Sequence, residues 1–199
     1  LESLKETARE LGIGTECRVI PIPVETGNDD SVKSMVEQSL SDLGHIDILI
    51  NCAAQPLGQG TTPSLSEITD KHFWQNMNIK VMGYLRCARE VAPHMQNQGW
   101  GRIINVSGLA SRQTGSTIGS MRNVAVTAMT KNLADELGPH GINVTVVHPG
   151  PTRTERTPEM IAELAKTQDI SIQEAERQMA AMNSIRRLID AKDIAYIIT

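Results

Sequence analysis

Apolar residues along this chain follow two patterns that alternate with each other. Short apolar runs, which predict buried strands, occur at 46–50, 102–106 and 142–147. Between these runs, apolar residues recur every three to four positions, which is the spacing of one helix face. Alternation of short strands with helices over short turns predicts a parallel α/β sheet.

The pattern also sets the expected bounds of the other elements. Helices are expected over 1–11, from Ser31 onward, over about 70–95 with an end near Pro93, and over 123–137. A short strand at a sheet edge is expected over 17–24, because Pro21 and Pro23 interrupt it. On the helix over 123–137, a packing stripe is expected at Ala125, Met129, Leu133 and Leu137.

The pattern changes after Gly150. Residues 154–184 predict two short amphipathic helices, the second of which begins at the capping-box sequence that starts with Ser171. Asp190 is expected to cap a final helix. The simplest interpretation of residues 154–184 is ordinary packing. Their place after a strand end favours a substrate lid instead, because loops of this kind lie over the carboxyl ends of the strands.

Length, charge and cysteine usage narrow the class of protein. The 199 residues favour one domain over 1–199, and a net charge of −4 with a pI near 5.7 offers no basic patch for nucleic acid. No apolar run approaches the ~18 residues of a membrane span, and the opening residues have the pattern of an amphipathic helix and not that of a signal peptide. Three scattered cysteines fit reduced thiols in a cytoplasmic protein, and neither they nor the five histidines have metal-ligand spacing.

The stretch 102–154 resembles the core of a short-chain dehydrogenase/reductase. The resemblance rests on a strand over 102–106, the helical sequence over 128–137, and the turn His148-Pro149-Gly150 after the next strand. It implies a Rossmann-like, doubly wound parallel sheet in three αβα layers. It also implies an incomplete fold, because the first two strands, their glycine-rich turn for the cofactor pyrophosphate and the last strand have no counterpart here.

The resemblance implies NAD or NADP as the cofactor and assigns positions to it. The sequence Asn51-Cys52-Ala53 resembles the family's Asn-Asn-Ala, in which the first Asn pins the sheet and the backbone after it follows the adenosine ribose. The cofactor-binding positions carried over in this way are Glu25, Asn51, Ala53, Pro149, Gly150, Thr152 and Thr154. A plain strand end at Asn51, a surface carboxylate at Glu25 and a common turn at Pro149-Gly150 are the alternatives.

The catalytic positions depart from the family pattern. Counting back from the helical sequence over 128–137 places Gly119 at the catalytic Tyr and Asn123 at the Lys that lowers its pKa. Gly108 stands at the Ser, next to Ser107, and Lys80 stands at the Asn of the proton relay. An alternative pair, Thr127 and Lys131, lies one turn too far along the helix.

Polar residues near these positions are candidates for a replacement set. Ser107, Lys80 and Asn123 are the candidate catalytic residues, with Arg112 as a further cation for an oxyanion. The interpretation that we favour at this stage is that Lys80 and Arg112 are solvated surface charges.

Two functions are compatible with this sequence. The first is an NAD(P)-dependent oxidoreductase with a non-standard active site, acting on a small carbonyl or alcohol substrate. The second is a catalytically inactive homologue that binds a dinucleotide or scaffolds a dimer. The resemblance implies a homodimer or homotetramer, and neither function requires nucleic acid or a membrane.

Overall fold

A three-stranded parallel sheet forms the centre of the molecule. The computed structural model describes residues 2–54 and 63–199. Strands β1 (Ile48–Asn51), β2 (Gly101–Val106) and β3 (Ile142–Val147) lie in the order β1-β2-β3. Asn51 pairs with Asn105, and Asn105 pairs with Val146, so the three strands end at the same edge. The expected parallel α/β fold is confirmed.

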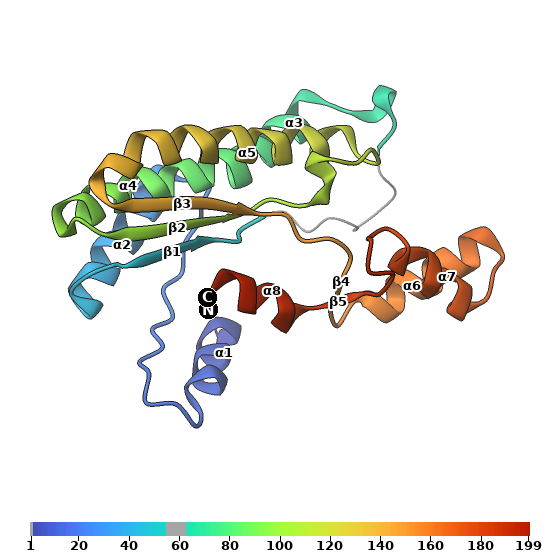
Figure 1. The fold of residues 1–199 in the computed structure, drawn as a ribbon, viewed down its shortest axis with the longest axis horizontal. Coiled ribbons are helices and arrows are strands. Elements are labelled where there is room, and N and C mark those ends of the chain that lie inside the picture. Colours follow the sequence, from blue (N-terminus) through green and yellow to red (C-terminus); the bar gives the residue numbers. More distant parts are fainter. Residues whose placement is uncertain (1, 55–62) are drawn as a thin grey trace.

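Helices cover both sides of this sheet, and a separate arm extends from it (Figure 1). The helices are α1 (Glu2–Gly12), α2 (Asp29–Leu43), α3 (Asp70–Asn76), α4 (Gly83–Gln98), α5 (Thr117–Leu137), α6 (Thr157–Gln168), α7 (Ile172–Ala180) and α8 (Ala191–Ile198). Short helical turns are η1 (Leu65–Glu67), η2 (Met77–Met82), η3 (Leu109–Ser111) and η4 (Gly138–His140). Helices α4 and α5 lie over one face of the sheet, whereas α1 and α8 lie on the opposite side.

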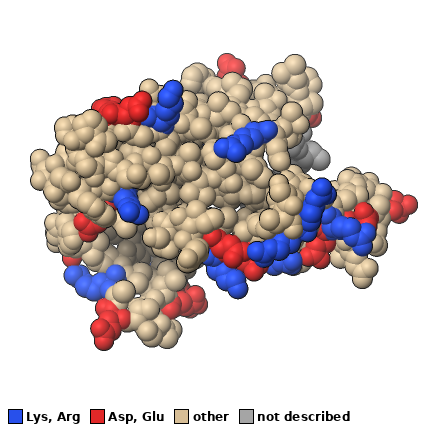
Figure 2. Space-filling view, viewed as in Figure 1, with Lys and Arg blue, Asp and Glu red and all other residues tan. Residues whose placement is uncertain are grey.

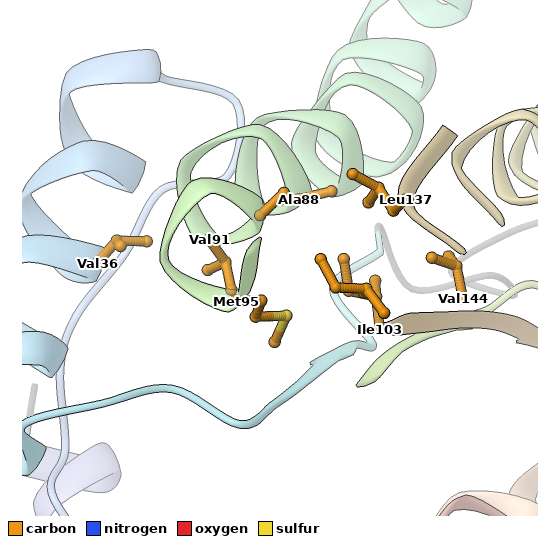
Figure 3. Packing of buried hydrophobic residues seen from close by; sticks show 9 residues of the cluster. Val36, Ala88, Val91, Met95, Ile103, Leu137 and Val144 are labelled. Carbon is orange, nitrogen blue, oxygen red and sulfur yellow. The ribbon is translucent and has the colours of Figure 1, made fainter. Parts of the chain in front are cut away.

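The main core lies between the sheet and the helices α2, α4 and α5 (Figure 3). Its most deeply buried members include Val91 and Met95 of α4 and Ile103 of β2. Burial of these side chains holds α4 in a helical conformation past Pro93, so the expected end of the helix near Pro93 is wrong. Tertiary packing overrides the loss of one hydrogen bond at the proline.

The strand expected over 17–24 is absent. These residues are extended but pair with no strand among the described residues. Pro21 and Pro23 have no N–H group to donate to a ladder, which disfavours strand pairing at these two positions. The expectation that two strands are missing next to it is untested and stays a prediction.

The packing stripe of α5 differs from the expected one. The most deeply buried side chains on this helix, in a line at every fourth residue, are Ile118, Arg122, Val126 and Thr130. Ala125, Met129 and Leu133 are only half-buried, whereas Leu137, the fourth expected member, is buried in the main core as expected. The helix also begins six residues earlier than expected, where Ser116 caps it by accepting a hydrogen bond from the Gly119 N–H.

The arm contains the two helices expected over 154–184. Helices α6 and α7 enclose a small core of their own around Ile161, Ala165, Ala175 and Leu188. Ser171 caps α7, as expected. The arm joins the body through strands β4 (Thr152–Arg153) and β5 (Ile189–Asp190), which pair in parallel. Figure 2 shows charged side chains of both signs gathered over this part of the molecule, whereas the helical face above the sheet is largely uncharged.

Two absences apply to the described residues only. No helix within residues 2–54 and 63–199 is both long and apolar enough to cross a membrane. In the same ranges, no three His, Cys, Asp or Glu side chains gather where they could hold a metal ion.

Candidate active site

The centre of the site is a buried contact between two helices. Lys80 lies in η2, a π-helical turn inside the long helical run from α3 to α4. Its Nζ donates to the Asn123 Oδ1 of α5 at 3.0 Å and to the Ser107 carbonyl oxygen at 2.7 Å. The structure therefore brings together Lys80, Ser107 and Asn123, the three candidate catalytic residues.

The interpretation of Lys80 as a solvated surface charge is wrong. Only 4% of Lys80 is exposed, because the π-helical turn and α5 enclose its side chain. Burial, followed by repulsion from the Arg122 guanidinium, lowers the pKa of Lys80 from 10.5 to about 8. Arg112, in contrast, is exposed and fits that interpretation.

Ser107 and Asn123 form a hydrogen bond with each other in addition to their hydrogen bonds with Lys80. The Ser107 hydroxyl donates to the Asn123 backbone carbonyl oxygen at 3.0 Å, so this hydroxyl has a structural partner. Gly108 follows with φ +153°, and a Cβ there would lie 3.0 Å from the Asn123 Nδ2. A serine at position 108 would crowd the amide that Lys80 binds.

A second buried cation lies beside this contact. Arg122 is 1% exposed, and its Nη1 donates to the Asn76 Oδ1 of α3 at 2.8 Å. Its Nε is buried, and no group in the described part of the chain forms a hydrogen bond with it. Sequence reasoning missed this residue, although one signal was present: Arg122 stands between Ile118 and Val126 at a spacing of four, on the buried line of α5.

Tyr84 is part of the site wall rather than a proton donor. Its hydroxyl donates to the Val106 carbonyl oxygen at 3.0 Å, and its ring lies 5.9 Å from the Lys80 Nζ. Burial raises the pKa of the Tyr84 phenol well above its ordinary range. A buried phenol that is already donating to a carbonyl has no proton available for a substrate.

Asn51 secures the sheet next to the site. Its Nδ2 donates to the Asn105 Oδ1 at 2.9 Å, and the Asn105 Nδ2 donates to the Thr130 Oγ1 at 2.9 Å. This chain of hydrogen bonds ties β1 to β2 and β2 to α5 through side chains. Asn51 therefore pins the sheet, as expected, whereas its role toward a cofactor stays a prediction.

The other expected cofactor-binding residues lie at the carboxyl edge of the sheet or beside η2. Ala53 is exposed directly after β1, and Pro149, Gly150 and Thr152 are half-buried directly after β3. Thr154 is exposed and donates its N–H to the Thr157 Oγ1 at 2.7 Å.

Glu25 is exposed at the start of a turn. Arg86 fastens this turn by donating to the Thr26 and Asn78 carbonyl oxygens at 3.0 and 3.1 Å. The Thr26 hydroxyl donates to the Ile79 carbonyl oxygen at 3.1 Å. The turn therefore contacts the residue that directly precedes Lys80 in the sequence.

His148 is a further group at this edge that the sequence analysis did not assign. Its Nδ1 lies 3.0 Å from the Ser111 Oγ and 3.4 Å from the Gly108 carbonyl oxygen. These contacts connect the end of β3 to η3, the turn that follows Gly108. His148 therefore positions the loop on which Ser107 and Gly108 lie.

Comparisons with known proteins agree with this architecture. A model of the short chain dehydrogenase family matches residues 1–165. The chain is 33% identical to the short-chain reductase protein NovJ of Streptomyces niveus over 151 residues, which are 75% of this chain and 56% of that protein. It is 26% identical to the NADPH-dependent reductase BacG of Bacillus subtilis over 199 residues, which are 99% of this chain and 74% of that protein.

A solved structure gives the same result. The crystal structure of L-sorbose reductase from Gluconobacter frateurii, complexed with NADPH and L-sorbose, matches with a TM-score of 0.86 at 25% identity. The match covers 99% of this chain and 74% of that one. The chain spans little more than half the length of the first curated relatives that it matches.

Proposed function

Because the chain belongs to the short-chain dehydrogenase family, we propose that it is an NAD(P)-dependent oxidoreductase in which the Lys80 amine supplies the proton. The observation that carries the proposal is the hydrogen bond from the Lys80 Nζ to the Asn123 Oδ1. In the family pattern, position 80 is an Asn, which carries an amide, and position 123 is a Lys, which carries an amine. The chain carries an amine at 80 and an amide at 123, so the two groups are exchanged between the helices.

The carboxyl edge of the sheet fits the nicotinamide half of a dinucleotide. Ala53 and Ala54 are small and exposed after β1, and the Pro149–Thr152 segment follows β3 at the same edge. Gly150 and Thr152 are the residues that would hold this half, whereas the backbone at Ala53 would follow the adenosine ribose. When bound, the dinucleotide would supply or accept a hydride. Whether it is NAD or NADP is left open by this proposal.

Side chains of the protein would supply the proton to the substrate oxygen and accept it in the reverse reaction. Reduction of a carbonyl to an alcohol needs one proton at the oxygen, and an amine with a pKa near 8 can supply or accept it near neutral pH. Ser107 and Asn123 occupy two of the three Nζ–H groups of Lys80 and so fix the direction of the third. The proton would pass from the third N–H toward the substrate oxygen through water.

The experiment is a turnover assay of the purified full-length protein with NADH or NADPH and a panel of small ketones, aldehydes and sugars. Lys80→Ala is the test variant, and Lys131→Ala, which alters an exposed lysine on α5, is its matched control. Turnover that disappears in Lys80→Ala and persists in Lys131→Ala supports the proposal. Turnover that is equal in both variants contradicts it.

The second candidate is an inactive homologue that binds a dinucleotide or scaffolds a dimer. It is favoured by the two glycines at positions 108 and 119 and by the engagement of the Tyr84 hydroxyl with a carbonyl oxygen. Cofactor titration separates the candidates, because tight binding without turnover supports the second one. A homodimer or homotetramer is compatible with both, and the exposed apolar side chains of Trp74, Met82, Met121 and Val124 on the α3–η2 run and on α5 support it.

A further inference from the structure

Two cations lie buried between the same pair of helical segments, and each is bound to a neutral amide of the opposite segment. Lys80 of η2 donates to Asn123 of α5, and Arg122 of α5 donates to Asn76 of α3. Lys80 is 4% exposed and Arg122 is 1% exposed. Each segment therefore contributes one cation and one amide to the interior.

No described group balances these two charges. Within residues 2–54 and 63–199, neither Lys80 nor Arg122 forms an ion pair with a carboxylate. Tyr84 is neutral, because its hydroxyl donates to the Val106 carbonyl oxygen and burial raises its pKa. Burial also raises the pKa of the Cys52 thiol, against the opposing effect of Lys80, so this thiol stays protonated at neutral pH. Buried charges in proteins are normally paired with an opposite charge.

The two cations also have hydrogen-bond donors to spare. The Arg122 Nε is buried and has no hydrogen-bond partner among the residues that the structure describes. The Lys80 ammonium has three donors, of which the Ser107 carbonyl oxygen and the Asn123 amide occupy two. Buried donors without an acceptor are rare, and such a group commonly marks an ion or water that binds there.

We propose that Arg122 and Lys80 form a binding site for a small monovalent anion, either a carboxylate or a halide. The guanidinium offers a planar fork that fits the two oxygens of a carboxylate, and the ammonium offers a compact point charge beside it. The near-complete burial of both cations limits the ligand to a small group. Its source is either a free ion or the carboxylate of an organic ligand, and both have the same chemistry at this site. The inference goes beyond the proposed oxidoreductase function and is tested without cofactor or turnover. An anion bound at the third N–H of Lys80 would have to leave before this N–H could pass a proton to a substrate.

The test is the thermal unfolding midpoint of the full-length protein without cofactor, in a buffer whose only anion is a bulky buffer sulfonate that carries no carboxylate. Sodium chloride, sodium acetate and sodium pyruvate are each added at constant ionic strength, and acetamide serves as the uncharged counterpart of acetate. We expect saturable rises of about 5 to 10 °C at a hundredfold excess over the dissociation constant, and none with acetamide. Equal shifts with acetate and acetamide, or no saturable shift with any anion, would overturn the proposal.

Variants locate the site, and the anion series identifies the source. Arg122→Met and Lys80→Met should each abolish the saturable shift, whereas Arg89→Met, which removes a half-exposed guanidinium on α4, should keep it. A shift that persists in both test variants would overturn the proposal. If the test variants do not fold, the comparison of acetate with acetamide on the unaltered protein still tests whether the site binds an anion. Similar affinities for chloride and pyruvate support a free-ion site, and at least tenfold tighter binding of pyruvate supports an organic carboxylate.

Discussion

The Lys80 Nζ donates to the Asn123 Oδ1 at 3.0 Å across 43 residues of chain, from a π-helical turn to the second turn of α5. Insertions that create π-helical turns are frequent at functional sites. This contact encloses an amine between two helices and connects it to the strand that ends at Ser107. The proposed role of Lys80 as the proton donor depends on this contact with Asn123.

Lys80→Met should lower kcat for carbonyl reduction about 100- to 10,000-fold, which is the range that a positioned acid or base contributes. Methionine keeps the length of the side chain and removes the amine. Cofactor affinity should change by less than about threefold, because Lys80 lies on the proton side of the site. Steady-state kinetics and a fluorescence titration with NADH and NADPH measure the two effects. A loss of cofactor affinity that equals the loss in kcat would speak against a proton role.

The stability of the protein should depend on the charge of Lys80. The folded-state pKa of about 8 lies below the ordinary value of 10.5, so between these pH values the unfolded chain binds more protons than the folded one. The free energy of unfolding should therefore rise with pH over this window, by up to about 3 kcal/mol from this group. Urea unfolding of the unaltered protein and of Lys80→Met at pH 7 to 10 isolates the effect. A difference between the two proteins that is constant with pH would contradict it.

Asn105→Ala should destabilise the fold strongly. Asn105 is 0% exposed, and its loss removes the acceptor of the Asn51 amide and the donor to the Thr130 hydroxyl, which keeps its own hydrogen bond to the Val126 carbonyl oxygen. Leaving the buried Asn51 amide without its acceptor, together with the loss of the hydrogen bond to Thr130, should cost about 2 to 4 kcal/mol. Urea unfolding measures the change, with Asn132→Ala on the exposed side of α5 as the control. The control should shift stability by less than about 0.5 kcal/mol.

Gly119→Tyr should not create an active enzyme of the usual family type. A Cβ at position 119 would lie 2.9 Å from the Ser116 Oγ, which accepts the Gly119 N–H and caps α5. Displacing this cap should cost about 1 kcal/mol, close to the cost of Ser116→Ala. Thermal unfolding and the turnover assay check both parts. A more active and equally stable variant would show that position 119 still accepts the family tyrosine.

The sequence predicted the framework of the molecule well, because its strands are short apolar runs and its helices carry regular stripes. The strand at 102–106 and the arm after Gly150 follow from such local patterns, whereas the role of Asn51 in the sheet was implied by the family resemblance. The burial of Lys80 does not, because it depends on a π-helical turn that has no sequence signature and on a helix 43 residues away. Arg122 escaped notice for a similar reason, since its neutral partner Asn76 is 46 residues distant.

The most direct test of the central claim is the pH dependence of kcat/KM for carbonyl reduction between pH 6 and 10. If the Lys80 ammonium supplies the proton, kcat/KM should be constant at low pH and fall about tenfold per pH unit above a pKa of about 8. Oxidation of the corresponding alcohol should rise through the same pH range, because it needs the neutral amine. A reduction rate that does not change across pH 8, or a protein that binds the cofactor and shows no turnover, would contradict the account.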